Sequence, residues 1–189
     1  MAEVKNLSVR YGKNAVLQNF SAVFPSGEVT AISGRSGSGK TTLLSAIMGL
    51  LRPALGEIIG FGTCSVLFQE DRLLPFLTAV KNITVTTGCT EAEAQDALQR
   101  VGFDPEDIEK LASALSGGMA RRVAIVRAML AKSDTLILDE PFKGLDDITR
   151  AAVIRFVNDN RCSRTTLVVT HDPRDTEDLG ASHSLHIDA

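Results

Sequence analysis

The order of apolar and polar residues predicts strands in the first third of the chain and strands alternating with helices after it. Leu7, Val9 and Tyr11 alternate with polar residues, which is the period of a half-buried strand. The apolar stretch at 16–24 predicts a second strand, and the run at 29–32 predicts a third, buried one. Further short strands are predicted at 56–59, 65–68, 135–138 and 167–170.

From about residue 77 the apolar residues follow the period of helices. The clearest helix is predicted at 91–101, because Thr90 can cap it and Glu93 stands at the capping-box position. Two more helices are predicted at 119–130 and 148–158. Strands that alternate with helices favour an α/β fold with a mainly parallel sheet.

The change of period also predicts how the domain is organised. We expect one domain over 1–189, because a chain of this length buries a single sizeable core. Residues 1–76 and 119–189 are expected to form the core, with an N-terminal antiparallel β-subdomain. Residues 77–118 are expected to form an inserted helical lobe.

Composition and charge narrow the classes of function. The net charge is −3, whereas domains that bind nucleic acid are usually basic, so we expect no nucleic-acid partner. Cys64, Cys89 and Cys162 are far apart and lack metal-site spacing, which indicates free thiols in a reducing compartment. No stretch approaches the ~18 apolar residues that span a bilayer. If the protein works at a membrane, we expect another chain to supply the spanning part.

Residues 34–42 read GRSGSGKTT and fit the phosphate-loop pattern G-x-x-x-x-G-K-[ST]. The predicted strand at 29–32 precedes the loop and a helix-like stretch follows it, which is the context that this motif requires. Glycines allow backbone N–H groups to surround phosphate oxygens in front of a helix N-terminus. Lys40 would reach the β- and γ-phosphates and Thr41 would hold Mg²⁺. The alternative is a glycine-rich turn that binds nothing.

A second acidic motif follows a hydrophobic strand. Residues 136–138 are apolar and end in Asp139 and Glu140. In phosphate-loop enzymes an Asp in this place helps to hold Mg²⁺, and a following Glu can polarise the attacking water. A strand that ends in a solvated acidic turn is the alternative, since such sequences are common.

Ser116, Gly117 and Gly118 predict a second glycine-containing loop that opens a helix. Its N-terminus could bind an anion with help from the serine hydroxyl. The alternative is an ordinary serine N-cap. One nucleotide does not need two such anion-binding loops. In two facing copies of the chain, however, each nucleotide would contact the phosphate loop of one copy and the second loop of the other.

Together these motifs resemble the ATP-binding subunits of ATP-binding-cassette (ABC) transporters, over nearly the whole chain. The family's motifs stand in its order: Tyr11 as the aromatic residue that stacks on adenine, GRSGSGKTT (Walker A), Gln69 (Q-loop), LSGGM at 115–119 (signature), TLILDEP at 135–141 (Walker B), Gly144-Leu145-Asp146 (D-loop) and Thr170-His171-Asp172 (H-loop). The resemblance implies a P-loop NTPase fold, with ATP and Mg²⁺ bound.

The resemblance also implies a role for each matching residue. Gln69 would contact Mg²⁺ and the lytic water, Asp139 would support Mg²⁺, and Glu140 would be the general base. His171 would hold the γ-phosphate, and Lys40 would take part in catalysis. The metal set is Thr41, Gln69 and Asp139. The nucleotide-binding set is Tyr11, Gly34, Ser36, Gly37, Ser38, Gly39, Lys40, Thr41, Thr42, Ser116, Gly117, Gly118 and Asp146.

The resemblance implies partners as well. ATP would hold two head-to-tail copies together, with the signature of one copy completing the site of the other and Asp146 linking the two sites. The dimer would energise transmembrane permease subunits, supplied by a substrate-binding protein, from the cytoplasmic face of the cell membrane. The stretch at 68–83 is similar to ATPases of nitrate-, sulfonate- and taurine-type importers.

Some residues depart from the family pattern or have a plainer explanation. Met119 replaces the usual signature glutamine, and the segment at 108–114, which normally touches the permease, is abbreviated. Arg121, Arg122 and Arg127 are expected to form a solvated basic helix face, although Arg121 or Arg122 could lie near the dimer seam. Tyr11 and His171 have ordinary packing as their alternative.

Two other functions stay open. A soluble ABC-type ATPase that acts on a non-membrane partner, similar to those of iron–sulfur assembly, is also a lone cassette. An exporter or lipoprotein-release ATPase differs from an importer only in its permease.

Overall fold

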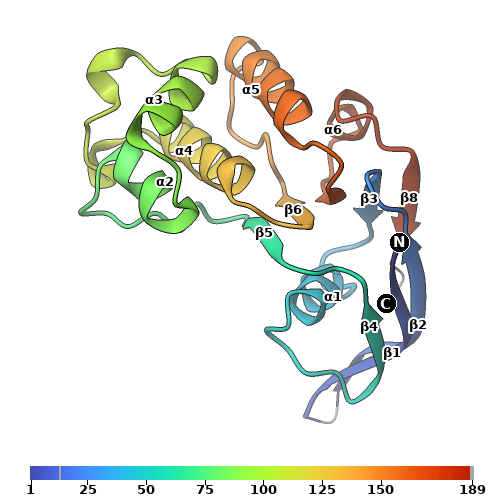
Figure 1. The fold of residues 1–189 in the computed structure, drawn as a ribbon. Coiled ribbons are helices and arrows are strands. Elements are labelled where there is room, and N and C mark those ends of the chain that lie inside the picture. Colours follow the sequence, from blue (N-terminus) through green and yellow to red (C-terminus); the bar gives the residue numbers. More distant parts are fainter. Residues whose placement is uncertain (13, 188–189) are drawn as a thin grey trace. The chain divides into compact units, whose positions relative to one another are not determined.

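The first third of the chain forms the predicted antiparallel sheet. In the computed structural model, which describes residues 1–12 and 14–187, β1 (Ala2–Tyr11) and β2 (Asn14–Phe24) make a long hairpin (Figure 1). β4 (Leu55–Ile59) pairs with the other edge of β1, which gives the order β2-β1-β4. The N-terminal antiparallel β-subdomain is therefore confirmed.

The burial pattern of β1 follows its register. Ala2 and Val4 are buried, and after a register shift the buried positions become Leu7 and Val9. Asn6 lies at this shift with a φ of 49°, the left-handed region that asparagine tolerates better than most residues. The irregularity keeps apolar side chains on one face of the sheet along the whole strand.

A second sheet has the strand order β5-β6-β7-β3-β8. Its strands are β3 (Val29–Ser33), β5 (Cys64–Leu67), β6 (Thr135–Asp139), β7 (Thr165–Val169) and β8 (His183–His186). β3 pairs in parallel with both neighbours, so that Ile32 lies opposite Val169 and Leu185. β7 is buried along its whole length, as expected for a parallel strand covered on both faces. The parallel arrangement confirms the predicted fold class.

The helices lie close to their predicted places. They are α1 (Lys40–Ile47), α2 (Ala79–Thr87), α3 (Glu91–Arg100), α4 (Gly117–Leu130), α5 (Asp147–Asn160) and α6 (Pro173–Asp178), with short 3-10 turns at Pro105–Asp107 and Ala112–Ala114. The predicted capping box is present, since Glu93 N donates to Thr90 Oγ1 at 3.2 Å and Thr90 N donates to Glu93 Oε2 at 2.8 Å.

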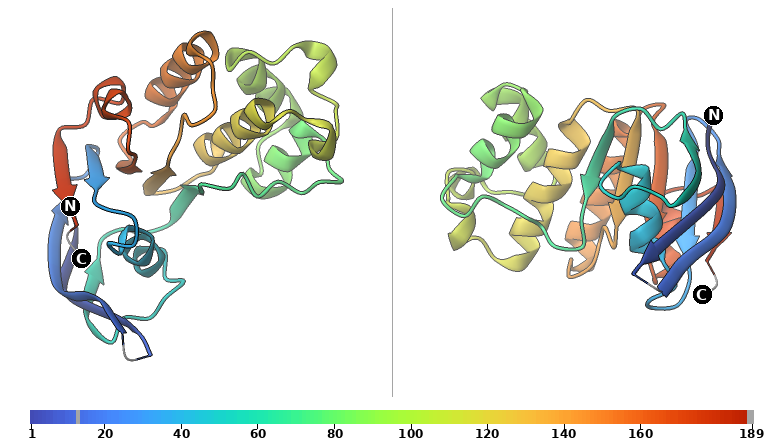
Figure 2. Two further views of the ribbon diagram at one scale, coloured as in Figure 1. Left: turned by 180° about the vertical axis from the view of Figure 1, so that it is seen from behind. Right: turned by 90° about the horizontal axis from the view of Figure 1, so that it is seen from below.

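The chain divides into two units by its internal contacts. The first contains Met1–Cys64, Ser133–Ile137 and Ser163–Ala189, and the second contains Ser65–Lys132 and Leu138–Cys162. In the second unit α2, α3 and α4 pack together, as two further views show (Figure 2). The helical lobe at 77–118 stays a prediction. Within the described part of the chain, no helix has both the length and the apolar character to cross a bilayer.

Candidate functional site

The phosphate loop joins β3 to α1 in the first unit. Gly34, Gly37 and Gly39 have φ values of 147°, 82° and 98°, which residues with a side chain rarely adopt. Gly39 is the N-cap of α1, so it offers no side chain to the free N–H groups of the first helical turn. An added Cβ at Gly37 would meet nothing within 4 Å among the described residues. The loop thus has open space beside Gly37, within reach of the first turn of α1.

Two polar side chains of the loop differ in their access to a ligand. Ser38 is 1% exposed, and its Oγ, which has no hydrogen-bond partner in the described part of the chain, is enclosed by the protein. Lys40 Nζ donates to the carbonyl oxygens of Gly34 at 2.7 Å and Arg35 at 2.9 Å. A phosphate chain therefore fits both the donors and the charge of the loop.

The β1–β2 hairpin lies against the end of the phosphate loop. A Cβ added at Gly39 would come 3.0 Å from Leu17 Cδ2 and 3.2 Å from Val16 Cγ1, both on β2. Tyr11 lies on the same hairpin, opposite Asn14, and is 54% exposed. More than half of the residue is therefore open to solvent, which leaves surface for stacking on a flat ligand.

His171 emerges at the same end of the sheet as the phosphate loop. β7 and β3 are parallel neighbours, and parallel strands present their carboxyl ends at one edge. The loop after β7 is held by Thr170 Oγ1, which donates to Asp175 Oδ2 at 2.6 Å and accepts from Asp172 N at 3.0 Å. His171 itself is exposed. The first unit thus brings the phosphate loop and His171 to one edge.

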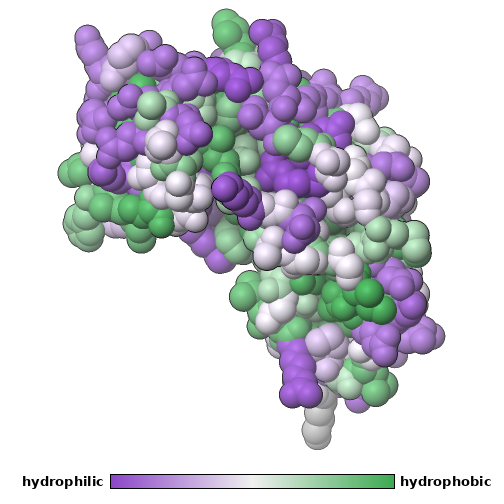
Figure 3. Space-filling model, viewed as in Figure 1, coloured by the Kyte–Doolittle hydropathy of each residue, from purple (hydrophilic) through white to green (hydrophobic). Residues whose placement is uncertain are grey.

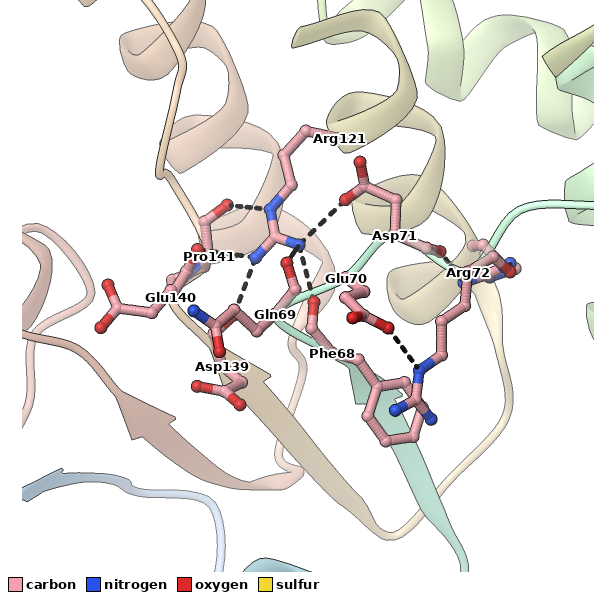
Figure 4. A network of polar contacts seen from close by, with 10 residues as sticks. Phe68, Gln69, Glu70, Asp71, Arg72, Arg121, Asp139, Glu140 and Pro141 are labelled. Carbon is pink, nitrogen blue, oxygen red and sulfur yellow. Dashed lines mark hydrogen bonds and ion pairs between the residues drawn. The ribbon is translucent and has the colours of Figure 1, made fainter. Parts of the chain in front are cut away.

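In the second unit, Arg121 forms hydrogen bonds to both the Q-loop and the end of the Walker B segment (Figure 4). Its Nη1 donates to Phe68 O at 2.7 Å and to Asp71 Oδ1 at 3.0 Å. Its Nη2 donates to Asp139 O at 2.7 Å and to Glu140 O at 2.6 Å. The guanidinium therefore joins the backbone of two candidate motifs that are distant in sequence.

The predicted solvated basic face on α4 is wrong for Arg121, which is 4% exposed. Arg122 is half-buried, with its guanidinium 4.7 Å from the ring centroid of Phe103, and Arg127 is half-buried too. The reason is that backbone carbonyls from other segments surround these side chains. Sequence reasoning missed Arg121 as a functional candidate, and the local sequence contained no signal for it, because Arg122 and Arg127 stand in the same stretch.

The signature and the D-loop lie together in the second unit. Ser116 caps α4, because its Oγ accepts from Met119 N at 3.3 Å. An added Cβ at Gly118 would lie 3.8 Å from Gly144 O. Asp146 caps α5, and hydrogen bonds from the Thr149 backbone and side chain hold its pKa below the ordinary value. Both motifs therefore also serve as helix caps, and α4 begins at Gly117, two residues before the predicted start.

Comparisons with known proteins agree with this geometry. Residues 17–143 match the ABC transporter family. The chain is 36% identical to the aliphatic sulfonates import ATP-binding protein SsuB of Corynebacterium glutamicum, over 99% of this chain and 80% of that protein. It is 32% identical to the ergothioneine transport ATP-binding protein EgtV of Helicobacter pylori, over 98% and 96%. It is 37% identical to the zinc import ATP-binding protein ZnuC of a Jannaschia species, over 97% and 73%.

Solved structures give the same result. The dimeric structure of a bacterial ABC transporter cassette superposes with a TM-score of 0.85 at 25% identity, covering 99% of this chain and 94% of that one. A dimeric cassette in a post-hydrolysis state with ADP and Pi gives 0.86 at 24% identity, over 100% and 94%, which shows the shared fold. The chain therefore belongs to the ABC transporter family, as an ATP-binding cassette that hydrolyses ATP.

Proposed function

We propose that the chain is the ATP-hydrolysing subunit of a binding-protein-dependent bacterial importer, working at the cytoplasmic face of the membrane through a permease. The phosphate loop carries the proposal, because its positive-φ glycines, the helix N-terminus behind them and the Lys40 ammonium fit a phosphate chain. The relatives named for sulfonates, ergothioneine and zinc are all ATP-binding subunits of uptake or transport systems. Their varied cargoes indicate that permease and binding protein select the solute.

The loop and its neighbours hold the substrate ATP. The phosphates lie among Gly34, Ser36, Gly37, Ser38, Gly39, Lys40, Thr41 and Thr42, with the backbone of 37–42 binding them, and Tyr11 stacks on the adenine. Thr41, Gln69 and Asp139 are the candidate ligands of Mg²⁺, which neutralises phosphate charge when bound. A hydroxyl, an amide oxygen and a carboxylate are ligands that this hard cation accepts.

Glu140 and His171 act on the reacting groups. Glu140 takes a proton from water as the water oxygen bonds to the γ-phosphorus, and the bond from that phosphorus to the ADP oxygen breaks. His171 contacts the γ-phosphate at the edge it shares with the phosphate loop. Gln69 orients the water.

A second copy completes each site. Ser116, Gly117 and Gly118 open α4 with free N–H groups, and this helix N-terminus is a second cradle for anions. One ATP molecule would occupy the phosphate loop of one copy and the signature of the other. Asp146 lies next to the signature through Gly144, a place from which it can link the two sites.

The permease has a candidate docking surface on the second unit, formed by Leu74, Phe76 and Leu111. Phe76 is 85% exposed, and Leu74 and Leu111 are also exposed. Apolar surface gathers at the left margin of the molecule in Figure 3. Exposed apolar patches of this kind mark contact sites for other proteins. We assign it to a cytoplasmic loop of the permease.

The docking surface has a fixed backbone. Ser113 N donates to Pro75 O at 3.1 Å and Ala112 N donates to Leu77 O at 2.9 Å, which ties its two segments together. Asn82 is buried and exchanges hydrogen bonds with the backbone of Leu74 at 2.7 and 3.1 Å. The abbreviated segment at 108–114 is therefore a paired part of this surface, which supports its use for coupling.

A pull-down of Glu140→Gln with Mg-ATP from detergent-solubilised cells of the source organism, read by mass spectrometry, tests this function. We expect to recover a multi-span permease. Phe76→Asp in that background should lose the permease, whereas Leu55→Asp, a charge at an exposed leucine in the first unit, should keep it. Recovery of only soluble proteins would contradict the importer and favour an ATPase of the iron–sulfur-assembly type.

A further inference from the structure

We infer that Arg121 is a positioning residue for ATP hydrolysis, which sets the backbone of Glu140 and the Q-loop as one rigid group. The inference rests on the proposed roles of Glu140 and Gln69. Arg121 touches neither carboxylate of the Walker B pair: both carboxylates point away from the guanidinium, while their backbone carbonyls accept from it (Figure 4).

All five N–H donors of the guanidinium are used. Nε donates to Pro141 O at 3.1 Å, Nη2 donates to Asp139 O and Glu140 O, and Nη1 donates to Phe68 O and Asp71 Oδ1. A guanidinium is planar and offers five donors in a fixed fork. The three Walker B carbonyls lie on one side of that fork and the Q-loop acceptors on the other.

Neither glutamine nor lysine can replace this fork. A glutamine amide has two donors on one nitrogen, and a lysine ammonium has three donors on one nitrogen. Each could hold one segment, but neither reaches both sets of acceptors. The bridge between the Q-loop and the Walker B segment therefore depends on arginine at position 121.

The backbone of Glu140 needs such support. Its φ is 48°, in the left-handed region of backbone angles. This conformation is unfavourable in free energy for a residue that has a side chain, and it persists only where the surrounding structure fixes it. Arg121 bonds to the carbonyls of Asp139, Glu140 and Pro141, which are consecutive and enclose this residue. The backbone of Glu140 sets the direction of its side chain. By fixing that backbone, the guanidinium orients the carboxylate of the proposed general base.

Burial makes the network costly to break. Arg121 is 4% exposed, and Asp71 is its ion-pair partner at 3.0 Å. A buried charge whose partners are removed is strongly destabilising, and so are carbonyls left without a donor. Movement of the Q-loop backbone is therefore transmitted to 139–141 rather than absorbed between them.

Arg127 provides a matched comparison on the same helix. It donates to Asp71 O at 2.7 Å and to Arg72 O at 2.9 Å, so it holds the same Q-loop segment. No hydrogen bond from it to 139–141 occurs among those resolved for the described residues. Its loss should loosen the Q-loop without releasing Glu140.

The test is single-turnover ATP hydrolysis and equilibrium ATP binding for wild type, Arg121→Gln, Arg127→Gln, Arg100→Gln and Glu140→Gln, with thermal unfolding of each. For Arg121→Gln we expect the hydrolysis rate constant to fall at least about tenfold and the Kd for ATP to stay within about threefold, because misplacement of a catalytic group costs rate rather than binding. Arg127→Gln should lose less rate, and Arg100→Gln, whose side chain pairs with Asp159 on the surface, should lose none.

Each outcome separates the claims. If Glu140→Gln is inactive and folded Arg121→Gln keeps the wild-type rate, the positioning role is overturned and the proposed function stands. If Glu140→Gln is itself active, the proposed function fails together with the inference. An equal loss of rate in Arg127→Gln would also overturn the bridge. Should Arg121→Gln not fold, Arg121→Lys keeps the charge and must show the same fall in rate at an unchanged Kd.

Discussion

At the scale of single residues, Lys40 shows how far the phosphate loop depends on individual polar contacts. Its ammonium bonds to the carbonyls of Gly34 and Arg35, at the start of the loop. Hydrogen bonds from an ammonium to phosphate oxygens are stronger than those to neutral carbonyls. A bound triphosphate therefore competes well for the Lys40 donors.

We expect Lys40→Ala to raise the Kd for ATP at least about tenfold, since a hydrogen bond to a charged group contributes about 1.5–3 kcal/mol. Calorimetric titration with Mg-ATP in the Glu140→Gln background measures it without turnover. Arg35→Ala removes the neighbouring exposed cation and should change the Kd by less than about threefold, as exposed charges contribute little. An unchanged Kd in Lys40→Ala would show that the loop does not hold the phosphates as proposed.

Arg121 shows what the residue pattern could not predict. The stretch after the signature mixes arginines with alanines and valines, so both a solvated and a buried arginine fit it. Arg121 is buried because backbone carbonyls at 68–71 and 139–141 accept hydrogen bonds from it, and these segments are far from it in sequence. The phosphate loop was predictable, by contrast, because its glycines, lysine and threonine are contiguous.

At the scale of elements, the N-terminus of α4 has two proposed uses. Ser116 caps the helix in this structure, and its hydroxyl is also proposed to meet the γ-phosphate of a second copy. An aspartate can cap a helix as well as a serine, but its charge repels phosphate. The two uses can therefore be separated by substitution.

For Ser116→Ala we expect the free energy of unfolding to fall by about 1 kcal/mol, the usual contribution of a cap. Ser116→Asp should stay within about 0.5 kcal/mol of wild type, because the cap is kept. In the Glu140→Gln background, sedimentation with Mg-ATP should show a dimer that Ser116→Asp abolishes. Full dimerisation of the Ser116→Asp protein would argue against a phosphate at this helix end.

The start of β6 is fixed by a carboxylate. Asp134 Oδ2 accepts from Thr63 N and Thr63 Oγ1, both at 2.8 Å. These hydrogen bonds, the backbone one first, hold the pKa of Asp134 below its ordinary value of 3.8. A carboxyl with a lowered folded pKa adds stability above its unfolded pKa, and this contribution is lost as the pH falls through the folded pKa.

Asp134→Asn should therefore be less stable than wild type at pH 7, and the difference should shrink as the pH falls below the ordinary pKa of 3.8. Urea unfolding at a series of pH values measures it. Asp96→Asn, at an exposed position of α3, controls for the change of charge. A difference for Asp134→Asn that is independent of pH would contradict the assigned cause.

Local signals explain which elements were predictable. The Thr90–Glu93 capping box lies within four residues of sequence, and α3 was predicted to within one residue of its observed end. The start of α4 was misplaced by two residues, because Gly117 and Gly118 have poor helix propensity and their place in the helix depends on the Ser116 cap.

At the scale of the whole molecule, the fold class followed from the sequence but the strand order did not. Alternating periods predicted a parallel sheet and an antiparallel N-terminal part. The pairing of Glu3 with both Val23 and Ile59, by contrast, joins strands that are far apart in the chain. Such pairings are decided by packing between distant segments, which a local pattern does not contain.

The whole molecule is proposed to work as an ATP-dependent dimer in which Glu140 hydrolyses the bound nucleotide. The most direct test is phosphate release from Mg-ATP by purified wild type and Glu140→Gln, at one stated protein concentration because the dimer is concentration-dependent. We expect the rate for Glu140→Gln to fall at least about a hundredfold, the usual contribution of a general base, while ATP remains bound to the protein. Equal rates for the two proteins would contradict the assignment of Glu140.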